Sequence, residues 1–372
     1  MRAKTLLLLA LYTLLGCSSD EVAGPVPGDF VYTSVSTGLN HACALTDTGS
    51  AYCWGRNDEG QLGDGTRIDR HTPVPVVGVT GLHMISAGDK HTCALDSEGL
   101  AYCWGTNLTG QLGDRTTESR LTPVPVSRGL NFQSIHPGIG HTCALTPAGE
   151  AYCWGEVLHG DLAYPPTPTP AGHHLTFRQL DSQYSLICGL TDEDELYCWG
   201  ELYVTDTVVN LSDYPLLIDD GLSGYSIAVG NGYVCGHAPS GQIECWLGWD
   251  VQPATALVGP YIAADGAVFD RNVRGTYPLC GIKADGQALC WRVSKSWLWG
   301  KELPYFDHLA EVQGVSFASL SRSAGWGSDL TCGVSLPAVQ DPGVFCQGSN
   351  YYGELGDGTR ERSDVPVKVL LP

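Results

Sequence analysis

The chain has 372 residues, of which 47 are Gly and 22 are Pro, and only 16% are charged against about 25% in ordinary globular domains. Hydrophobic residues make up 43%, and 10 Trp, 17 Tyr and 7 Phe supply core material, which excludes disorder for most of the chain. The net charge of −20, without any run of Lys or Arg, argues against nucleic acid as a partner, because phosphate backbones attract basic surfaces.

The first residues resemble an export signal. A basic start with Arg2 and Lys4 is followed by an apolar run from Leu6 to Leu15. This run is about half of what a membrane-spanning helix needs, so residues 1–16 are predicted to be a signal peptide. The run ends in Leu14-Leu15-Gly16-Cys17, which resembles the bacterial lipobox and implies cleavage before Cys17 and a lipid on its thiol. The alternative is an ordinary signal peptide followed by a chance cysteine.

Residues 17–29 are mostly small and include Pro and Gly, so we expect a lipidated Cys17 and a flexible tether ahead of a domain over 30–372. Removal of Arg2 and Lys4 with the signal would bring the net charge to −22. The expected location is the bacterial cell envelope, outside the cytoplasm, and the outer membrane where the host has one.

The other 14 cysteines fall into pairs, six of them ten residues apart and the last fourteen apart. The first members recur at steps of 50, 50, 45, 47, 45 and 52 residues, a period typical of solenoids and propellers. The pairs are Cys43/Cys53, Cys93/Cys103, Cys143/Cys153, Cys188/Cys198, Cys235/Cys245, Cys280/Cys290 and Cys332/Cys346.

One strand register explains the ten-residue spacing. If Cys43 lies opposite Cys53 in an antiparallel pair, residues 47–49 form a three-residue turn with Gly49 at its left-handed position. In the fourth unit Asp194 takes the glycine position, which Asp tolerates better than most residues. Opposed cysteines in a non-hydrogen-bonded pair are close enough for a disulfide, so one bridge per hairpin is predicted. Zinc is the alternative, but no Cys-x-x-Cys motif is present.

Two further strands complete each unit. Segments such as 31–35, 82–87, 132–135 and 224–229 precede the hairpin, and Pro-Val segments at 73–76, 123–126 and 366–369 follow it. Proline is tolerated on edge strands, so the Pro-Val strands should lie at the rim. The predicted fold is all-β: a seven-bladed β-propeller of four-stranded antiparallel blades with one intra-blade disulfide per blade. The strand 366–371 should lie beside residues 30–35, so that the chain ends clasp.

The repeat resembles a known family. The first unit reads His41-x-Cys43-Ala44-Leu45, then Cys53-Trp54-Gly55-x-Asn57-x-x-Gly60-Gln61-Leu62-Gly63-Asp64-Gly65-Thr66, and the second and last units return to it. This pattern resembles the regulator-of-chromosome-condensation repeat over about residues 30–372, which implies a seven-bladed propeller. The founder's nucleotide exchange and chromatin docking are not expected here, given the export signal and acidic charge. Exported bacterial members, one of which inhibits β-lactamases through loops on one face, are the nearer resemblance.

Several polar residues repeat with the units and are interpreted as structural. His41, His91 and His141 share one position and are expected to be structural, hydrogen-bonding residues; metal binding or acid–base chemistry is the alternative. Asp64, Asp114 and Asp357 are expected to hold their own turns. The tandem His173-His174 is a weak metal candidate because adjacent side chains diverge. No cofactor and no metal site are predicted. The Trp after each second cysteine should pack between blades; these are Trp54, Trp104, Trp154, Trp199, Trp246 and Trp291.

No catalytic motif is present: the sequence lacks a Gly-x-Ser-x-Gly elbow, a His-Glu-x-x-His pair and a phosphate-binding glycine loop. We therefore expect no catalytic residues and no enzyme. In units four to six the repeat is degenerate, and aromatic residues in such loops are favoured at binding surfaces. The candidate anchors are Tyr203, Trp249, Trp297 and Trp299. Repair of packing in the degenerate units is the alternative role for these tryptophans.

The sequence thus predicts a lipid-anchored, monomeric, non-catalytic binding scaffold for an envelope or secreted protein. The alternative is a carbohydrate-binding or glycan-hydrolysing propeller that uses the same aromatic residues as stacking platforms.

Overall fold

A computed structural model describes residues 30–156, 165–183, 185–204, 207–230, 233–240, 242–247, 254–257, 261–265, 277–283, 285–298, 301–312, 314–322, 330–339 and 341–372. Within these ranges all the named elements are strands. None of the described segments is a helix long and apolar enough to cross a membrane.

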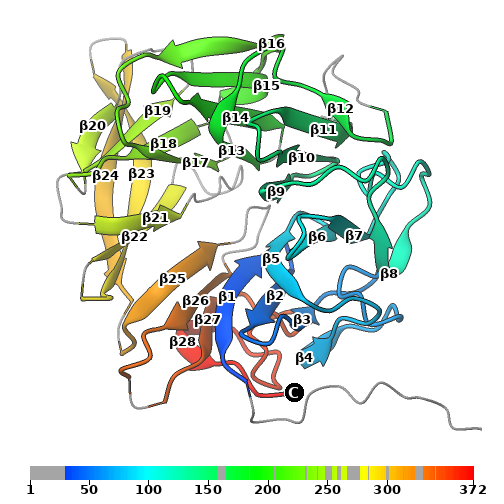
Figure 1. Ribbon diagram of the computed structural model, residues 1–372. Coiled ribbons are helices and arrows are strands. Elements are labelled where there is room, and N and C mark those ends of the chain that lie inside the picture. Colours follow the sequence, from blue (N-terminus) through cyan, green and yellow to red (C-terminus); the bar gives the residue numbers. More distant parts are fainter. Residues whose placement is uncertain are drawn as a thin grey trace, which may run out of the picture.

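The described strands form seven four-stranded sheets arranged around a central axis (Figure 1). The strands nearest the axis are β1 (Tyr32–Thr37), β5 (Leu82–Ala87), β9 (Ser134–Pro137), β13 (Phe177–Gln183), β17 (Ser226–Gly230), β21 (Tyr261–Asp265) and β25 (Phe317–Arg322). The second strands are β2 (His41–Thr46), β6 (His91–Asp96), β10 (His141–Leu145), β14 (Leu186–Thr191), β18 (Tyr233–His237), β22 (Tyr277–Lys283) and β26 (Thr331–Ser335).

The third strands are β3 (Ala51–Gly55), β7 (Ala101–Gly105), β11 (Ala151–Gly155), β15 (Leu196–Val204), β19 (Ile243–Leu247), β23 (Ala288–Leu298) and β27 (Val344–Gly348). The outermost strands are β4 (Arg70–Pro75), β8 (Arg120–Pro125), β12 (Thr169–Pro170), β16 (Thr207–Asp219), β20 (Ala254–Leu257), β24 (Lys301–Glu311) and β28 (Ser363–Lys368). Each sheet therefore consists of four strands that are consecutive in the chain. The Pro-Val segments lie in β4, β8 and β28, so their predicted place at the rim is confirmed.

The predicted hairpin register is confirmed. Cys43 lies opposite Cys53, and Leu45 lies opposite Ala51. Gly49 has φ 74° and Asp194 has φ 66°, so both occupy the left-handed region that a type I turn with a following bulge requires. The cysteine spacing and the glycine position have the same cause, which is a three-residue turn at the tip of each hairpin.

The prediction of one disulfide in each of seven blades is corrected to six intra-blade disulfides among the described residues. In these six the paired cysteines have Cα atoms 4.0–4.1 Å apart, the separation of a non-hydrogen-bonded antiparallel pair. The bridges are Cys43–Cys53, Cys93–Cys103, Cys143–Cys153, Cys188–Cys198, Cys235–Cys245 and Cys332–Cys346. In the remaining sheet, β21–β24, Cys280 lies opposite Cys290 in backbone register, but the Cys290 side chain lies outside the described part.

That sheet also departs from the repeat in its strand lengths, and the physical reason lies in the sequence. In the first unit the loop Gly60-Gln61-Leu62-Gly63-Asp64 follows the Trp-Gly strand and ends it. The β21–β24 sheet lacks this loop, so β23 and β24 continue as a paired ribbon of 11 residues each. The same loss in the fourth unit gives β15 with 9 residues and β16 with 13.

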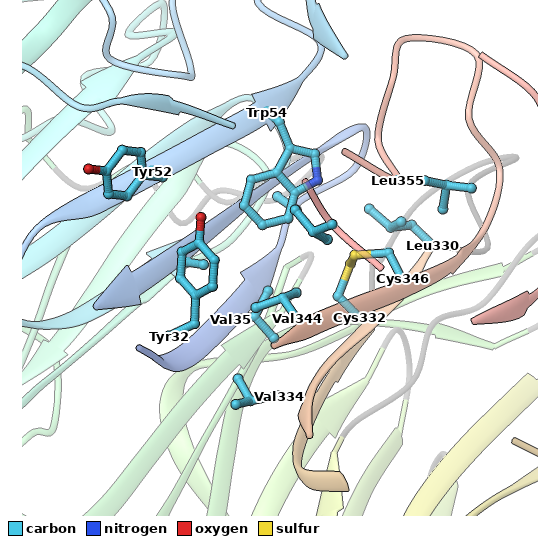
Figure 2. Close-up of a cluster of buried hydrophobic side chains, with 13 residues drawn as sticks. Tyr32, Val35, Tyr52, Trp54, Leu330, Cys332, Val334, Val344, Cys346 and Leu355 are labelled. Carbon is cyan, nitrogen blue, oxygen red and sulfur yellow. A yellow bond between two sulfur atoms is a disulfide. The ribbon is translucent and has the colours of Figure 1, made fainter. Parts of the chain in front are cut away.

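Hydrophobic side chains fill the junctions between neighbouring blades. Trp54, Trp104, Trp154 and Trp199 are fully buried and Trp246 is nearly so, which confirms their predicted place in the core; the side chain of Trp291 lies outside the described part. At the junction of the last and first blades, Trp54 and Tyr32 pack with Val334, Val344 and the Cys332–Cys346 disulfide (Figure 2).

The ends of the chain close the ring by packing and not by strand pairing. Strand β28 pairs with β27, and β1 pairs with β2, so residues 366–371 and 30–35 belong to different sheets. They lie side by side as expected, since Val369 contributes its side chain to the cluster that contains Tyr32 and Val35. Each blade uses one uninterrupted repeat, so the chain ends exchange no strand.

Candidate binding face

The shared histidines connect neighbouring blades. His41 Nε2 lies 2.9 Å from Thr92 Oγ1, and the Thr92 hydroxyl donates to the backbone carbonyl of Gln61 at 2.9 Å. Trp104 Nε1 donates to the same carbonyl at 2.9 Å. His91, Thr142, Gln111 and Trp154 repeat this arrangement at the next junction. The structural interpretation of these two histidines is confirmed.

Burial also keeps these imidazoles neutral. It lowers the pKa of His41 to about 3 and that of His91 to about 3, since both rings lie in the interior. Burial lowers the pKa of His141 to about 4. His141 has no hydrogen-bond partner among the described residues, because Ile187 stands in the fourth unit where Thr92 and Thr142 stand in the second and third. Neutral, buried rings of this kind are not placed for acid–base chemistry at pH 7.

The aspartates of the repeat hold their own loops, as predicted. Asn57 Nδ2 donates to Asp64 Oδ1 at 3.0 Å, and Asp64 Oδ1 accepts the Thr66 backbone N–H at 2.9 Å. Arg70 Nε donates to Asp64 Oδ2 at 2.9 Å. Burial opposes ionisation of Asp64, but these hydrogen bonds outweigh it and lower the pKa of the carboxyl. Within the described residues no group of three or more His, Cys, Asp or Glu side chains could hold a metal ion.

The loops after the third strands emerge on one face of the ring. Arg56 N–H donates to the Asn40 carbonyl at 2.8 Å, and Thr106 N–H donates to the Lys90 carbonyl at 2.9 Å. Each loop thus begins beside the turn between the first and second strands of its own blade. We call this side the loop face; it comprises turns 38–40, 88–90 and 138–140 and loops 56–69, 106–119 and 349–362.

An aromatic and charged cluster lies on the loop face where the last blade meets the first. We call Arg56, Asp58, Tyr351 and Tyr352 the tyrosine patch. Tyr351 is 75% exposed, and its ring centroid lies 4.9 Å from that of Tyr352. The Arg56 guanidinium lies 5.0 Å from the Tyr352 ring centroid and donates to both Asp58 carboxylate oxygens, at 2.9 and 2.5 Å. In the second blade the position of Tyr351 is taken by Leu108, which is 74% exposed.

This composition is common at protein-binding surfaces. Tyr and Arg are the residue types enriched at interface hot spots, and solvated tyrosines lose little rotamer entropy on contact. The sequence prediction missed the patch because Tyr351 and Tyr352 occupy positions that hold Asp58 and Glu59 in the first unit. Two adjacent tyrosines in a loop that holds none in the first two units were the signal that could have found it.

A shallow depression lies at the centre of the loop face, around the axis. Its free volume is about 20 Å³, which is room for about one water molecule and far less than a drug-sized ligand needs. We call it the axial mouth; its lining residues are Thr37, Gly38, Leu39, Ala87, Gly88, Asp89, Pro137, Gly138, Ile139 and Gln183.

Two of the four sequence-predicted anchors lie in the extended ribbons. Tyr203 lies opposite Val208 in the β15–β16 ribbon, and Trp297 lies opposite Glu302 in the β23–β24 ribbon. In both sheets the third strand continues beyond the residue that pairs with the start of the second strand. The loops of the loop face begin at this same end of the third strand, so both ribbons extend on the side of the loop face. The side chains of Tyr203 and Trp297, and the whole of Trp249 and Trp299, lie outside the described part.

Cys17 lies outside the described residues. His173 and His174 both have positive φ, at 46° and 78°, and the His173 ring lies 4.3 Å from the exposed ring of Tyr214. The structure therefore gives this histidine pair a rim contact with an aromatic side chain.

Sequence comparisons match the first repeats of the chain. Residues 48–95 match the regulator of chromosome condensation (RCC1) repeat, and residues 32–61 and 85–111 match a second description of the same repeat. Ras guanine nucleotide exchange factor C of Dictyostelium discoideum is 46% identical over 43 residues, which are 12% of this chain and 3% of that protein. The ultraviolet-B receptor UVR8 of Arabidopsis thaliana is 37% identical over 73 residues, 18% of this chain and 16% of that protein. The chain thus spans only a small part of the length of these curated relatives.

The structural comparison extends the likeness to most of the chain. The crystal structure of Prp20p from Saccharomyces cerevisiae, a protein with binding properties toward Gsp1p and histones, matches with a TM-score of 0.65. The match covers 91% of this chain and 87% of Prp20p at 18% sequence identity. At this identity the likeness shows the fold alone. The chain is an RCC1-like β-propeller.

Proposed function

We propose that this RCC1-like propeller is a non-catalytic scaffold that recognises a protein partner through its loop face. The tyrosine patch is the observation that carries the proposal. It combines an exposed tyrosine, a second tyrosine against which an arginine stacks, and an arginine already oriented by Asp58. Preorganised groups of this kind lose less conformational entropy on binding than free surface side chains.

A protein partner also agrees with the shape of the face. The axial mouth is too small for a drug-sized ligand, whereas ring-arranged loops offer a broad surface. Prp20p, with the same fold, binds Gsp1p and histones, which supports a protein partner in general terms. Tyr203, Trp249, Trp297 and Trp299 are proposed as additional anchors for the partner.

We further propose that the chain acts as a monomer outside the bacterial cytoplasm, tethered by a lipid on Cys17 to the cell envelope, with an envelope or secreted protein as its partner. Six local disulfides support an oxidising compartment, because cytosolic thiols are kept reduced. The export signal over residues 1–16 and the lipobox before Cys17 carry the tether.

The test is capture of partner proteins from the native envelope fraction on the immobilised chain, with the bound proteins quantified by mass spectrometry. Tyr351→Ala should reduce capture of a specific partner about five- to tenfold, as expected for loss of an interface anchor worth more than 1 kcal/mol. The melting temperature should not change, because Tyr351 is exposed.

Tyr214→Ala is the matched control, since Tyr214 is 61% exposed but lies on the outer strand β16. Equal loss in both variants, or undiminished capture by Tyr351→Ala, would contradict a role for the loop face. Retention on a glycan array, with no protein captured, would instead support the carbohydrate-binding alternative.

A further inference from the structure

A buried glutamine holds the start of the repeat loop in the first two blades. Gln61 Oε1 accepts the Glu59 backbone N–H at 2.9 Å, and Gln61 Nε2 donates to Asp58 Oδ1 at 3.3 Å. In the second blade Gln111 Oε1 accepts the Thr109 backbone N–H at 3.0 Å. Both glutamines are buried. This position therefore takes a side chain with a hydrogen-bond acceptor on one branch and a donor on the other.

A glutamate occupies this position in the last blade. Glu354 is fully buried, and its Oε2 accepts the Tyr352 backbone N–H at 2.7 Å, as the glutamine oxygen does in the other two loops. Its Oε1 corresponds to the amide nitrogen of Gln61 and has no partner in the described structure. Only a protonated carboxyl reproduces the acceptor and the donor of glutamine. The ionised form leaves a charge in the interior of the protein, which is unfavourable.

The surroundings of Glu354 place its ionisation near neutral pH. Burial raises the pKa of Glu354 to about 7, backbone hydrogen bonds of residues 352–354 oppose the shift, and the charge of Asp69 adds to it. The ionised fraction therefore rises from about 10% at pH 6 to about 90% at pH 8.

The charged and titratable groups of the first blade that face this loop are engaged with other groups. Gly353 packs against this blade, since a Cβ there would lie 2.5 Å from the His71 ring and 3.0 Å from the Arg70 carbonyl oxygen. His71 Nε2 accepts a hydrogen bond from Arg360 Nε at 2.7 Å. The remaining contacts are Arg56 with Asp58, Arg70 with Asp64 and Asp69 with the Asn57 backbone N–H.

Glu354 also connects the tyrosine patch to the first blade. Its carboxyl group holds the Tyr352 backbone, and its carbonyl accepts the Trp54 indole N–H at 2.8 Å. Leu355, the next residue, packs in the same junction cluster as Trp54 (Figure 2). The patch itself is shared between two blades, because Arg56 of the first blade lies over the Tyr352 ring of the last. A shift of residues 351–354 that brings the carboxylate to water would therefore separate the two halves of the patch.

We propose that Glu354 is a pH-dependent positioning residue for the tyrosine patch: its protonated form holds Tyr352 against Arg56, and its ionised form loosens this contact. On ionisation the proton passes to water, and the turn shifts so that water reaches the carboxylate. The patch then binds its protein partner more weakly above neutral pH. The inference rests on the proposed function, because the regulated surface is the one that recognises the partner.

The test is a titration of the ¹⁵N-labelled full chain between pH 5.5 and 8.5, followed by NMR. Two signals are observed: the Tyr352 amide, identified by its loss from a ¹⁵N-tyrosine sample of Tyr352→Phe, and the Arg56 Nε–H, identified by its loss in Arg56→Lys. Both should titrate with a common midpoint near pH 7. In Glu354→Gln, which carries the residue of the first two blades, both signals should lose this titration.

Matched positions and variants make the test specific. The Thr109 amide, which donates to Gln111, should not titrate. Glu361→Gln, at an exposed position in the same loop, should retain the titration of both signals. Burial raises the pKa of Asp89 to about 6, and Arg56 acts on it through its charge, so Asp89→Asn must also retain the Arg56 titration near pH 7.

Two results would overturn the proposal. If neither signal titrates near pH 7, the buried carboxyl does not change its charge in this range. If the Tyr352 amide titrates while the Arg56 signal stays constant, Glu354 releases a proton without moving the patch.

Partner capture separates this inference from the proposed function. The wild type should capture less partner from the envelope fraction at pH 8 than at pH 6, whereas Glu354→Gln should capture equal amounts. Equal capture by the wild type at both pH values would overturn the regulation of binding. If Tyr351→Ala loses the partner but Arg56 does not titrate, only this inference fails. If both signals titrate but Tyr351→Ala captures normally, Glu354 positions the patch and the proposed function fails.

Discussion

At the junction of the last and first blades, a glutamate stands where the first two units have glutamine. Gln61 and Gln111 are replaced by Glu354, which is fully buried. Its Oε2 accepts the Tyr352 backbone N–H at 2.7 Å, while Oε1 has no partner in the described structure. Burial raises the pKa of Glu354 to about 7, with nearby backbone hydrogen bonds opposing the shift. The folded state therefore holds a proton here that the unfolded chain, with a pKa near 4.5, releases.

We expect Glu354→Gln to reduce the pH dependence of stability. Because the folded pKa is raised, the contribution of Glu354 is fully present below about pH 4.5 and is lost as pH rises through about 7. Relative to Glu354→Gln, the wild-type free energy of unfolding should fall by up to about 3 kcal/mol between pH 5 and 8. Urea titrations at both pH values measure this difference.

Glu361→Gln, at an exposed position in the same loop, is the matched control and should retain the wild-type pH profile. Burial raises the pKa of Asp89 to about 6, so this residue also makes stability depend on pH. Comparing Glu354→Gln with the wild type cancels this contribution, because both proteins contain Asp89. A Glu354→Gln profile parallel to the wild type would show that the buried carboxyl does not hold a proton in the folded state.

Prediction from the sequence was least complete for the roles of individual residues. The roles of His41 and Asp64 could be predicted because each recurs at a fixed position, and recurrence indicates a structural need. The role of Tyr351 could not, because a tyrosine stands at this repeat position in one blade only. Its importance depends on what the neighbouring blade places beside it, and that is a property of the closed ring.

Among the elements, the hairpins were the most predictable and the ribbons the least. Cysteine spacing and Gly49 together fix the hairpin register, since a three-residue turn permits only one pairing. The ribbons β15–β16 and β23–β24 carry no comparable signal: their sequences show only that the Gly-Gln-Leu-Gly-Asp loop is missing.

Removing one hairpin disulfide tests its contribution to stability. The pair Cys93→Ala with Cys103→Ala should lower the free energy of unfolding by roughly 2–3 kcal/mol, because the bridge restricts a short loop in the unfolded chain. The measurement is urea unfolding followed by tryptophan fluorescence. Cys17→Ala, which removes the one cysteine outside the seven repeat pairs, should leave the curve unchanged. Identical curves for the double variant and the wild type would show that the bridge adds nothing beyond the hairpin itself.

The whole molecule has one junction that differs from the rest, between the last blade and the first. Elsewhere the chain runs directly from one blade to the next, as it does over residues 76–81. At this junction only side chains and loop contacts connect the blades, among them Trp54 Nε1 to the Glu354 carbonyl at 2.8 Å and Gly358 N–H to the His71 carbonyl at 2.9 Å. Local opening of the ring should therefore begin here.

Hydrogen exchange compares this junction with its neighbour. Trp54→Phe and Trp104→Phe each remove one indole hydrogen bond, to the Glu354 and Gln61 carbonyls respectively. Trp54→Phe should speed amide exchange in β1 and β27 about tenfold, equivalent to about 1.4 kcal/mol, because no peptide link holds the two blades together. Trp104→Phe should have a smaller effect on β5 and β6. Equal effects at both junctions would show that the covalent connection does not matter for local opening.

The use of one unbroken repeat for each sheet has a consequence for how the protein matures. The polypeptide leaves the ribosome or a translocation channel from its N-terminus onward. Each blade can therefore pair its own four strands, and bring its own cysteines together, before the next blade emerges. No strand made early stays unpaired and prone to aggregation until a partner strand from the end of the chain has been synthesised. Once the chain is complete, only the packing of the last blade against the first remains.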